Sequence, residues 1–225
     1  MEVSLLKKVP LFHSLKKDEL EKIARLTSLH NYSKDCIILM EEETGTSLFI
    51  INKGSVKISR VSDEGKEVIL AILREGDFFG ELSLLNGETR SANVTTIEDS
   101  ELLILRREDF YNLLNKHPEL SILLLKELAR RIRMSDTQIK SLSLLDAVGR
   151  VASTIIQLYE TKGTIKEGKM IIEKLPSQQD MANMAGTSRE TVSRALNMFA
   201  KEGFIVKKRN KVIIEKFKKF KGLYG

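Results

Sequence analysis

The amino-acid sequence predicts an α+β fold with a strand-rich N-terminal part, one long helix and a mixed C-terminal part. Short apolar runs separated by turn residues occupy residues 36–105, and apolar residues then recur every three or four positions along residues 118–145. Residues 146–225 carry 16 basic and 8 acidic side chains, whereas residues 1–145 carry 21 and 23. We therefore expect three parts, residues 1–117, 118–145 and 146–225.

The composition is typical of a globular protein with room for two modest domains, because 42% of the 225 residues are hydrophobic. No apolar stretch approaches the roughly 20 residues of a membrane helix, and the N-terminus lacks the pattern of a secretory signal. Cys36 is the only cysteine, so the chain forms no intramolecular disulfide and no cysteine-bound cluster. We expect a cytoplasmic protein without membrane contact.

Short β-rich runs dominate the N-terminal part. Residues 15–29 first place apolar side chains near helical spacing among charges, which indicates an amphipathic helix. The expected strands are Ile37 to Met40, Leu48 to Ile51, Ser55 to Val61, Val68 to Leu73, Ala92 to Thr96 and Glu101 to Leu105. Turn residues such as Lys53-Gly54 and Asn86-Gly87 separate them at regular spacing. This pattern predicts an antiparallel β-roll or barrel.

A long helix is expected after a break at His117-Pro118, because proline suits the first turn of a helix and disfavours helix just before it. Its apolar seam runs through Leu125, Leu128, Ile132, Ser135, Ile139 and Leu142. Steps of three and four residues let two helices pack as a coiled coil, so we expect a homodimer. A helix that packs on its own β-roll gives a similar stripe and stays open as an alternative. The Ser135 hydroxyl either bonds to a backbone carbonyl or faces a polar ligand.

Two capping-box patterns follow in the basic part of the chain. Asp146 first caps a helix expected over Ala147 to Tyr159, and this junction is a plausible hinge. Ser177-Gln178-Gln179-Asp180 and Thr187-Ser188-Arg189-Glu190 then start two helices ten residues apart, with Gly186 in the tight turn between them. The side chains expected to be buried are Met181, Met184, Ala185, Val192, Ala195, Leu196 and Phe199. The arrangement is typical of a helix-turn-helix.

The exposed face of the second helix carries side chains that can read DNA. Arg189 and Arg194 can each donate two parallel hydrogen bonds to guanine, and the Glu190 carboxylate can accept one from cytosine, with Ser193 beside them. The basic excess also favours a polyanion, because cations that neutralise phosphates release condensed counterions. We therefore expect double-stranded DNA as a partner. A solvated helix face with i,i+4 contacts is the alternative.

A basic hairpin completes a winged helix. Phe204 to Val206 and Val212 to Ile214 read as strands around Lys207–Lys211, and Lys208, Arg209 and Lys211 are expected to grip the sugar-phosphate backbone. A short helix with Phe217, Phe220 and Tyr224 on one face should close the domain. Residues 160–169 are expected to form a polar loop, which is a candidate contact with RNA polymerase.

With these parts in order, the chain resembles the cyclic-AMP receptor protein family, also called the catabolite activator family, over nearly its whole length. Gly76–Ser83, continuing through Asn86-Gly87 to Arg90-Ser91-Ala92, looks like the phosphate-binding cassette of cyclic-nucleotide domains. The resemblance implies that Glu81 bonds to a ribose hydroxyl and that Arg90 and Ser91 hold a cyclic phosphate. The effector-binding residues implied by the cassette are Gly80, Glu81, Leu82, Ser83, Arg90 and Ser91. An arginine–phosphate contact beside the amides of a glycine-containing loop is sound phosphate chemistry.

The resemblance continues through Ala129–Ile132 and Leu145–Arg150, which are similar to the family's dimer helix and hinge. Where the cyclic-AMP binders have adjacent Thr and Ser in contact with adenine, this chain has Ser135 and Asp136. The Asp136 carboxylate either accepts from an adenine amine or rejects the nucleotide through its desolvation cost. The implied effector is cyclic AMP or another small anion, and a retained fold that binds no nucleotide is the alternative.

The third matching segment, Gly186–Arg194, is nearly the family's recognition helix, which implies a palindromic site with TGTGA-type half-sites. The residues expected to contact DNA are Gln179, Ser188, Arg189, Glu190, Thr191, Ser193, Arg194, Lys208, Arg209 and Lys211. We expect no haem, iron–sulfur cluster or other metal, because the chain lacks the cysteines, and His13, His30 and His117 show no ligand pairing.

The sequence thus predicts a homodimeric transcription regulator whose DNA binding is gated by a small effector. We expect no enzymatic activity, because no His, Cys and carboxylate residues have catalytic spacing. Two other functions stay open. One is a cyclic-nucleotide-binding signalling module that acts on a protein partner, and the other is a regulator that binds DNA without an effector.

Overall fold

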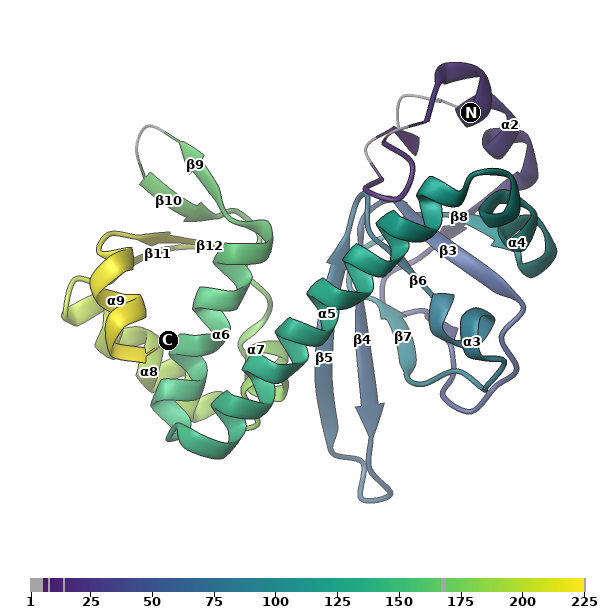
Figure 1. The fold of residues 1–225 in the computed structure, drawn as a ribbon. Helices are drawn as coiled ribbons and strands as arrows, with labels where there is room; N and C mark the ends of the chain where they lie inside the picture. The colour runs from purple at the N-terminus through teal and green to yellow at the C-terminus, as the bar shows by residue number, and fades with distance from the viewer. Residues whose placement is uncertain (1–5, 8, 14, 167–168, 225) are drawn as a thin grey trace. The chain divides into compact units, whose positions relative to one another are not determined.

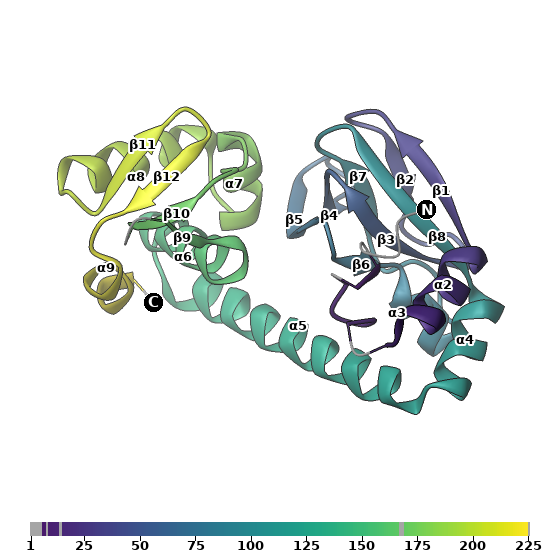
Figure 2. The same ribbon diagram turned by 90° about the horizontal axis from the view of Figure 1, so that it is seen from above.

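The computed structural model describes residues 6–7, 9–13, 15–166 and 169–224. The chain forms two compact units, residues 1–132 and 133–225. The division falls inside the long helix α5 (Pro118–Leu144), which is labelled with the other elements in Figures 1 and 2. No helix among the described residues is long and apolar enough to cross a membrane.

The first unit is a roll of two four-stranded antiparallel sheets with helices around it. Its elements are α2 (Lys17–Leu26), β1 (Thr27–Tyr32), β2 (Ile37–Leu39), β3 (Ser47–Lys53), β4 (Ser55–Val61), β5 (Glu67–Arg74), β6 (Phe78–Phe79), α3 (Glu81–Asn86), β7 (Asn93–Thr96), β8 (Ser100–Arg106), α4 (Arg107–Lys116) and the first part of α5. The strand orders are β1-β8-β3-β6 and β2-β7-β4-β5. The α+β class and the expected β-roll are confirmed.

Two short strands escape the sequence pattern. The expected helix over residues 15–29 ends at Leu26, because Thr27–Tyr32 pairs with β8 as strand β1, from Thr27 opposite Leu105 to Tyr32 opposite Ser100. Leu29 in β1 is exposed, so no apolar alternation marks this strand. Strand β6 has two residues, Phe78 and Phe79, and pairs only with β3 within the described chain.

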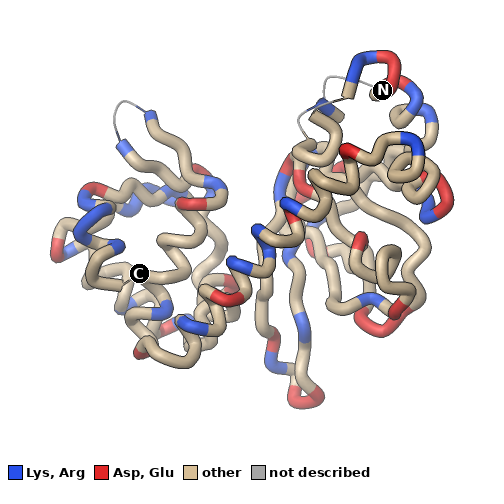
Figure 3. The backbone as a smooth tube through the Cα atoms, viewed as in Figure 1, with Lys and Arg blue, Asp and Glu red and all other residues tan. Residues whose placement is uncertain are grey.

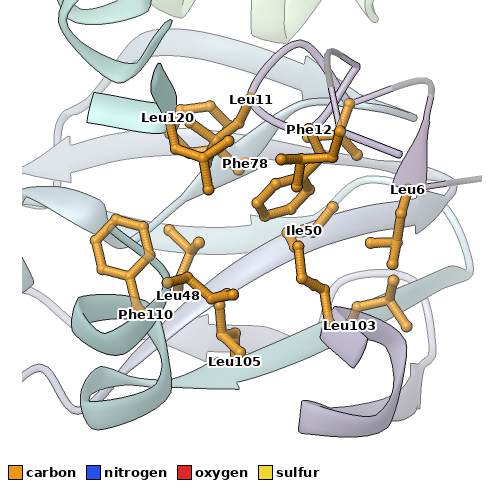
Figure 4. Packing of buried hydrophobic residues seen from close by; sticks show 14 of the residues in the cluster. Leu6, Leu11, Phe12, Leu48, Ile50, Phe78, Leu103, Leu105, Phe110 and Leu120 are labelled. Atoms are coloured by element: carbon orange, nitrogen blue, oxygen red, sulfur yellow. The ribbon is translucent and has the colours of Figure 1, made fainter. Parts of the chain in front are cut away.

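A hydrophobic core lies between the β1-β8-β3-β6 sheet and the helices of the first unit. Its buried side chains come from the N-terminal segment, strands β3, β6 and β8 and helices α2 to α5, and Figure 4 shows Phe12, Leu48, Phe78, Leu105 and Phe110 among them. Full burial of such a side chain stabilises a fold by about 1.5–3 kcal/mol. The turn from β6 into α3 is therefore anchored through Phe78, which is 1% exposed.

The apolar seam of α5 is largely uncovered in the single chain. Leu125, Ile132 and Ile139 are 61–64% exposed, and Leu142 is 45% exposed. Only Leu128 among the seam residues packs partly against the described core of the roll. The stripe is therefore not explained by packing on the protein's own sheets, which was the alternative to a coiled coil.

Beyond α5, the described part of the second unit holds four helices and a four-stranded antiparallel sheet. After the end of α5 its elements are α6 (Ala147–Lys162), β9 (Thr164–Lys166), β10 (Lys169–Ile172), α7 (Gln178–Ala185), α8 (Arg189–Lys201), β11 (Ile205–Lys208), β12 (Lys211–Ile214) and α9 (Phe217–Tyr224). The strand order is β11-β12-β10-β9, so the basic hairpin is one edge of a larger sheet. The expected polar loop over residues 160–169 is wrong, since α6 ends at Lys162 and β9 and β10 follow; residues 167–168 lie outside the described chain.

Candidate effector site and nucleic-acid interface

The cassette begins where β6 turns into α3. Gly80 at the N-terminus of α3 has φ 83° and Gly87 at its C-terminus has φ 75°, a backbone region that favours glycine. A Cβ atom on Gly45 in the facing loop would lie 2.1 Å from Ser83 Oγ and 3.0 Å from Arg90 Cζ. The two loops therefore approach closely only because position 45 carries no side chain.

Arg90 is the central cation of the cassette. Its residue is 5% exposed, and its guanidinium donates to Gly80 O (2.7 Å), Ser83 Oγ (2.8 Å) and Ser47 O (2.9 Å). An arginine carries five N–H donors, so these bonds leave two for a ligand. Burial lowers the pKa of Arg90, and the charge of Glu81 opposes that shift.

Glu81 lies at the first position of α3 and is 3% exposed. Its Oε1 accepts from Arg131 Nη1 at 3.0 Å, while its Oε2 is buried without a hydrogen-bond partner among the described residues. Burial raises the pKa of this carboxyl, and the Arg131 charge acts in the opposite direction. An acceptor held dry and half-satisfied is suited to a ligand hydroxyl.

Arg131 connects the cassette to α5, a role that the sequence did not reveal. Its guanidinium donates to Phe78 O (2.7 Å) and to Glu127 Oε1 (2.9 Å), and it stacks on the Phe78 ring at 4.7 Å from the centroid. The i,i+4 spacing of Glu127 and Arg131 is visible in the sequence. Their partner Glu81 is not, because it lies 50 positions away.

The structure brings four of the expected effector residues together. Gly80, Glu81 and Ser83, at the start of α3, lie around the Arg90 guanidinium. Leu82 is 45% exposed, and Ser91 is exposed directly after Arg90. Ser135 and Asp136 are exposed on the part of α5 that belongs to the second unit.

The helix-turn-helix is built as expected, with one change at a cap. Ser177 Oγ accepts from Asp180 N at 3.0 Å and starts α7. At α8 the cap is Ser188, which accepts from Thr191 N at 3.2 Å, and not Thr187. Thr187 instead donates its backbone N–H to Ala182 O, which closes the turn and moves the start of α8 by one residue. The expected buried side chains of both helices are confirmed.

Arg150 fixes the turn of this motif to the segment between α5 and α6. Its guanidinium donates to Ala185 O (2.8 Å) and Gly186 O (3.1 Å) in the turn, and to Leu145 O (3.1 Å). Asp146 beside it caps α6 by accepting from Gly149 N at 2.7 Å. One side chain thus bonds both to the hinge segment and to the turn. In the sequence, Arg150 was named only as part of the segment that resembles the family's hinge.

The face expected to read DNA is open to solvent. Arg189, Glu190 and Arg194 are exposed at the N-terminal turns of α8. Within the described chain Glu190 and Arg194 form no ion pair, so the alternative lattice of i,i+4 contacts is incomplete; Arg194 instead donates to Thr191 Oγ1 at 3.4 Å. The pKa of Glu190 is lowered by its own amide at the helix start and then by Ser188.

The remaining expected contacts surround this face. Gln179 on α7 is exposed and bonds to Asn183, and Ser193 is half-buried on α8. Figure 3 shows basic segments along β11, β12 and α9 of the second unit. Lys208 and Arg209 are exposed at the hairpin turn, where Arg209 has φ 47°. Lys211 is paired with Glu173, the residue after β10, which Lys166 also contacts at 2.7 Å.

Comparison with known proteins agrees with this geometry. A family model for the cyclic nucleotide-binding domain matches residues 29–117, and one for the Crp-like helix-turn-helix domain matches residues 149–223. The chain is 35% identical over 196 residues to the cyclic AMP receptor protein of Thermus thermophilus, covering 87% of this chain and 88% of the relative. The chain belongs to the cyclic-AMP receptor protein family.

Further relatives extend the match. A CRP-like cAMP-activated global transcriptional regulator of Mycobacterium tuberculosis is 31% identical over 210 residues, covering 93% of this chain and 94% of the relative. The solved structure of a CooA mutant from Carboxydothermus hydrogenoformans has a TM-score of 0.81 at 25% identity, covering 98% of this chain and 95% of that one. The catabolite activator protein of Thermus thermophilus has a TM-score of 0.55 at 32% identity, covering 96% and 98%.

As a member of this family, the protein is a transcription regulator with a cyclic nucleotide-binding domain and a DNA-binding helix-turn-helix. Its cassette fits a phosphate-bearing ligand, because it combines a buried guanidinium, a half-satisfied carboxylate and a glycine-lined backbone. Within the described ranges, no group of three His, Cys, Asp or Glu residues could hold a metal ion.

Proposed function

We propose that the protein is a homodimeric regulator that binds a palindromic DNA site when a small phosphate-bearing effector, cyclic AMP or a related anion, fills its cassette. The observation that carries this proposal is Arg90. It is buried, yet no carboxylate of the described chain lies within salt-bridge distance of it. A buried charge without a counter-charge is costly, and a bound phosphate compensates it.

The effector contacts follow from the donors and acceptors of the cassette. The free N–H bonds of Arg90 hold the phosphate, the buried Glu81 Oε2 accepts from a sugar hydroxyl, and Ser91 and the α3 amides line the same loop. Ser135 and Asp136 of α5 are assigned to the base. No step of this function is catalytic.

Gating requires that the effector bind the DNA-competent arrangement more tightly than the other one. Glu81 is positioned to couple the two sites, because its other carboxylate oxygen, Oε1, already accepts a hydrogen bond from Arg131 of α5. A sugar hydroxyl that bonds to Glu81 changes the strength of the ion pair between Glu81 and Arg131. The cassette thereby acts on the middle of α5, the helix that leads to the second unit.

Dimerisation is assigned to the α5 seam. Leu125, Ile132 and Ile139 are exposed by more than half in the single chain, and a second copy of the same stripe buries them in knobs-into-holes packing. Two copies place two recognition helices on one duplex, which matches the symmetry of a palindromic site.

On DNA, Arg189, Glu190 and Arg194 read a TGTGA-type half-site in the major groove. Lys208 and Arg209 of the hairpin contact phosphates, and Lys211 is assigned as a further contact with which its salt bridge to Glu173 competes. The remaining assigned contacts are Gln179, Ser188, Thr191 and Ser193. The β9–β10 hairpin is the proposed contact with RNA polymerase.

The test is fluorescence anisotropy with a labelled duplex of two TGTGA half-sites at one fixed salt concentration. We expect cyclic AMP to strengthen wild-type binding and to leave the Arg90→Met protein unchanged. Arg60→Met, at an exposed arginine of β4, is the matched control and should respond like wild type. A folded wild-type protein that shows no preference for this duplex over a scrambled one, at any salt or nucleotide concentration, contradicts the proposal.

A second candidate is a regulator that binds DNA without an effector. Arg90 already donates to three oxygen atoms of the protein, so the cassette can close on its own groups. In that case the same titration gives strong sequence-specific binding that no nucleotide alters, and Arg90→Met lowers the melting temperature instead.

A further inference from the structure

A second arginine reaches the cassette from α4. Arg107, the first residue of that helix, donates from Nη2 to Ser83 O at 2.7 Å. Arg90 donates to the Oγ of the same residue at 2.8 Å. Two guanidinium groups thus flank Ser83 on α3, although they come from the loop before β7 and from the start of α4.

Neither guanidinium has a carboxylate partner in the part of the chain that the structure describes. Arg131, by contrast, is paired with both Glu81 and Glu127. The Nε of Arg107 is also buried without an acceptor from any described residue. Its bond to Ser83 O explains why the side chain points at α3, but that bond leaves both the charge and this N–H uncompensated.

The two cations influence each other. Burial is the main cause that lowers the pKa of Arg90, and after the opposing charge of Glu81 the next cause is repulsion from Arg107. Glu43 also attracts Arg90, from beyond salt-bridge distance. Two like charges around one residue in a poorly solvated site are unfavourable in the free protein, and negative charge added there relieves the repulsion.

The negative charge that a ligand can carry at this site depends on the number of arginines there that lack a carboxylate partner. A cyclic phosphodiester carries one negative charge, which offsets one guanidinium. A terminal phosphate monoester carries about −1.5 to −2 charges at neutral pH, and two linked phosphodiesters carry two. Arginine binds such oxygen pairs through parallel N–H bonds.

We propose that Arg107 is a second phosphate-binding residue of the cassette and that the effector presents two negative phosphate charges to Arg90 and Arg107 together. This inference rests on the proposed function, since it assigns the charge of the ligand bound at that same site. It makes Arg107 the residue that distinguishes a dianionic effector from a cyclic mononucleotide.

Calorimetric titration of the full-length protein with three probes tests this assignment. The probes are cyclic AMP, which has one charge, adenosine 5′-monophosphate, which has a terminal phosphate, and cyclic di-AMP, which has two phosphodiesters. We expect one of the two dianionic probes to bind wild type more tightly than cyclic AMP, and its identity tells the two sources of charge apart. Arg107→Met should weaken that probe by about ten- to a hundredfold, as expected for lost charged hydrogen bonds, and weaken cyclic AMP less than threefold.

The controls separate binding from folding. Arg106→Met removes the neighbouring exposed arginine and should leave all three affinities unchanged. Arg107→Lys keeps the charge and should retain most of the preference for the dianion, and melting temperatures report any loss of the Ser83 contact. If cyclic AMP binds wild type more tightly than both dianions, or if Arg107→Met weakens all probes equally, the assignment is wrong while the proposed function stands. If no probe binds and Arg90→Met changes nothing, both fail.

Discussion

Single side chains of the two units differ in burial and in the hydrogen bonds that they form. Glu81 and Arg90 are buried in the cassette, where Glu81 Oε2 and two N–H donors of Arg90 have no described partner, whereas Arg150 is only half-buried and bonds to three backbone carbonyls of the second unit. Unused donors and acceptors in a dry site are suited to a ligand, whereas satisfied ones hold a structure in place. The same residue type thus serves binding at position 90 and rigidity at position 150.

The first prediction concerns Arg150. Its replacement by Met keeps the apolar stem but leaves the carbonyls of Leu145, Ala185 and Gly186 without their charged donor, so we expect the free energy of unfolding to fall by about 2 kcal/mol. DNA affinity should fall as well, because the turn that positions α8 loosens. Urea unfolding and anisotropy measure the two effects, with Lys201→Met at the end of α8 as control. Unchanged DNA affinity in a destabilised Arg150→Met protein would show that the turn is held by packing alone.

Glu173 gives a second prediction at the same scale. Hydrogen bonds from Lys166 and then Lys211 lower its pKa to about 2. A carboxyl with a lowered pKa contributes stability that is present above its ordinary pKa and lost as pH falls toward 2, so both lysines stay paired at neutral pH. Glu173→Gln therefore frees Lys211 for a DNA phosphate, and the slope of log affinity against log salt should steepen by about 1. The double variant with Lys211→Met should return that slope to its wild-type value, and a single variant with an unaltered slope contradicts the role of Lys211.

Whole elements divide into those that carry a repeating pattern and those that depend on a partner. Strands β3, β4, β5 and β8 and helices α5 to α8 could be predicted, because their apolar residues repeat at the period of the element and their ends carry caps or turn residues. Strand β1 could not, since its burial pattern is almost uniformly exposed and its pairing with β8 is non-local.

The same reason limits the prediction of the candidate site. Glu81 and Arg90 lie in one short cassette with glycines at its turns, so they are readable from the sequence. Arg107 and Arg131 enter the cassette from other elements, through contacts that only the folded chain brings about. At α8, residue spacing alone could not decide between Thr187 and Ser188 as the N-cap, because both side chains can accept a hydrogen bond from a backbone amide.

Helix α5 has an apolar seam that is largely exposed in the single chain, and this seam gives the third prediction. Ile139→Asp places a charge near the C-terminal end of the exposed seam, where a coiled-coil partner would bury it, so the dimer should dissociate. Sedimentation velocity measures the change in mass, and we expect monomer at micromolar concentration. Lys140→Asp, one position away and off the seam, should stay dimeric. A wild-type protein that sediments as a monomer, or an Ile139→Asp protein that stays dimeric, contradicts the assignment of this surface.

At the scale of the whole molecule, α5 belongs to both compact units. Arg131 ties its first part to Glu81 of the cassette, and the helix runs on to Leu144, two residues before the Asp146 cap of α6. A change in the ion pair between Glu81 and Arg131 therefore acts on α5, the helix that continues into the DNA-binding unit. Under the proposed gating, effector and DNA act on one equilibrium between two arrangements of the chain.

Such coupling must be reciprocal, and this gives the last prediction. If cyclic AMP strengthens binding to the palindromic duplex by some factor, that duplex must strengthen cyclic AMP binding by the same factor, which for coupled sites is typically about 5- to 150-fold. Calorimetric titration of cyclic AMP into the protein, free and saturated with duplex, measures the second factor against the anisotropy value for the first. A scrambled duplex at the same concentration controls for non-specific binding. Glu81→Gln should reduce both factors together, because it removes one of the two carboxylate charges that hold Arg131. Factors that both equal one would mean that the two units bind their ligands independently, and α5 would then be a dimer helix without a signalling role.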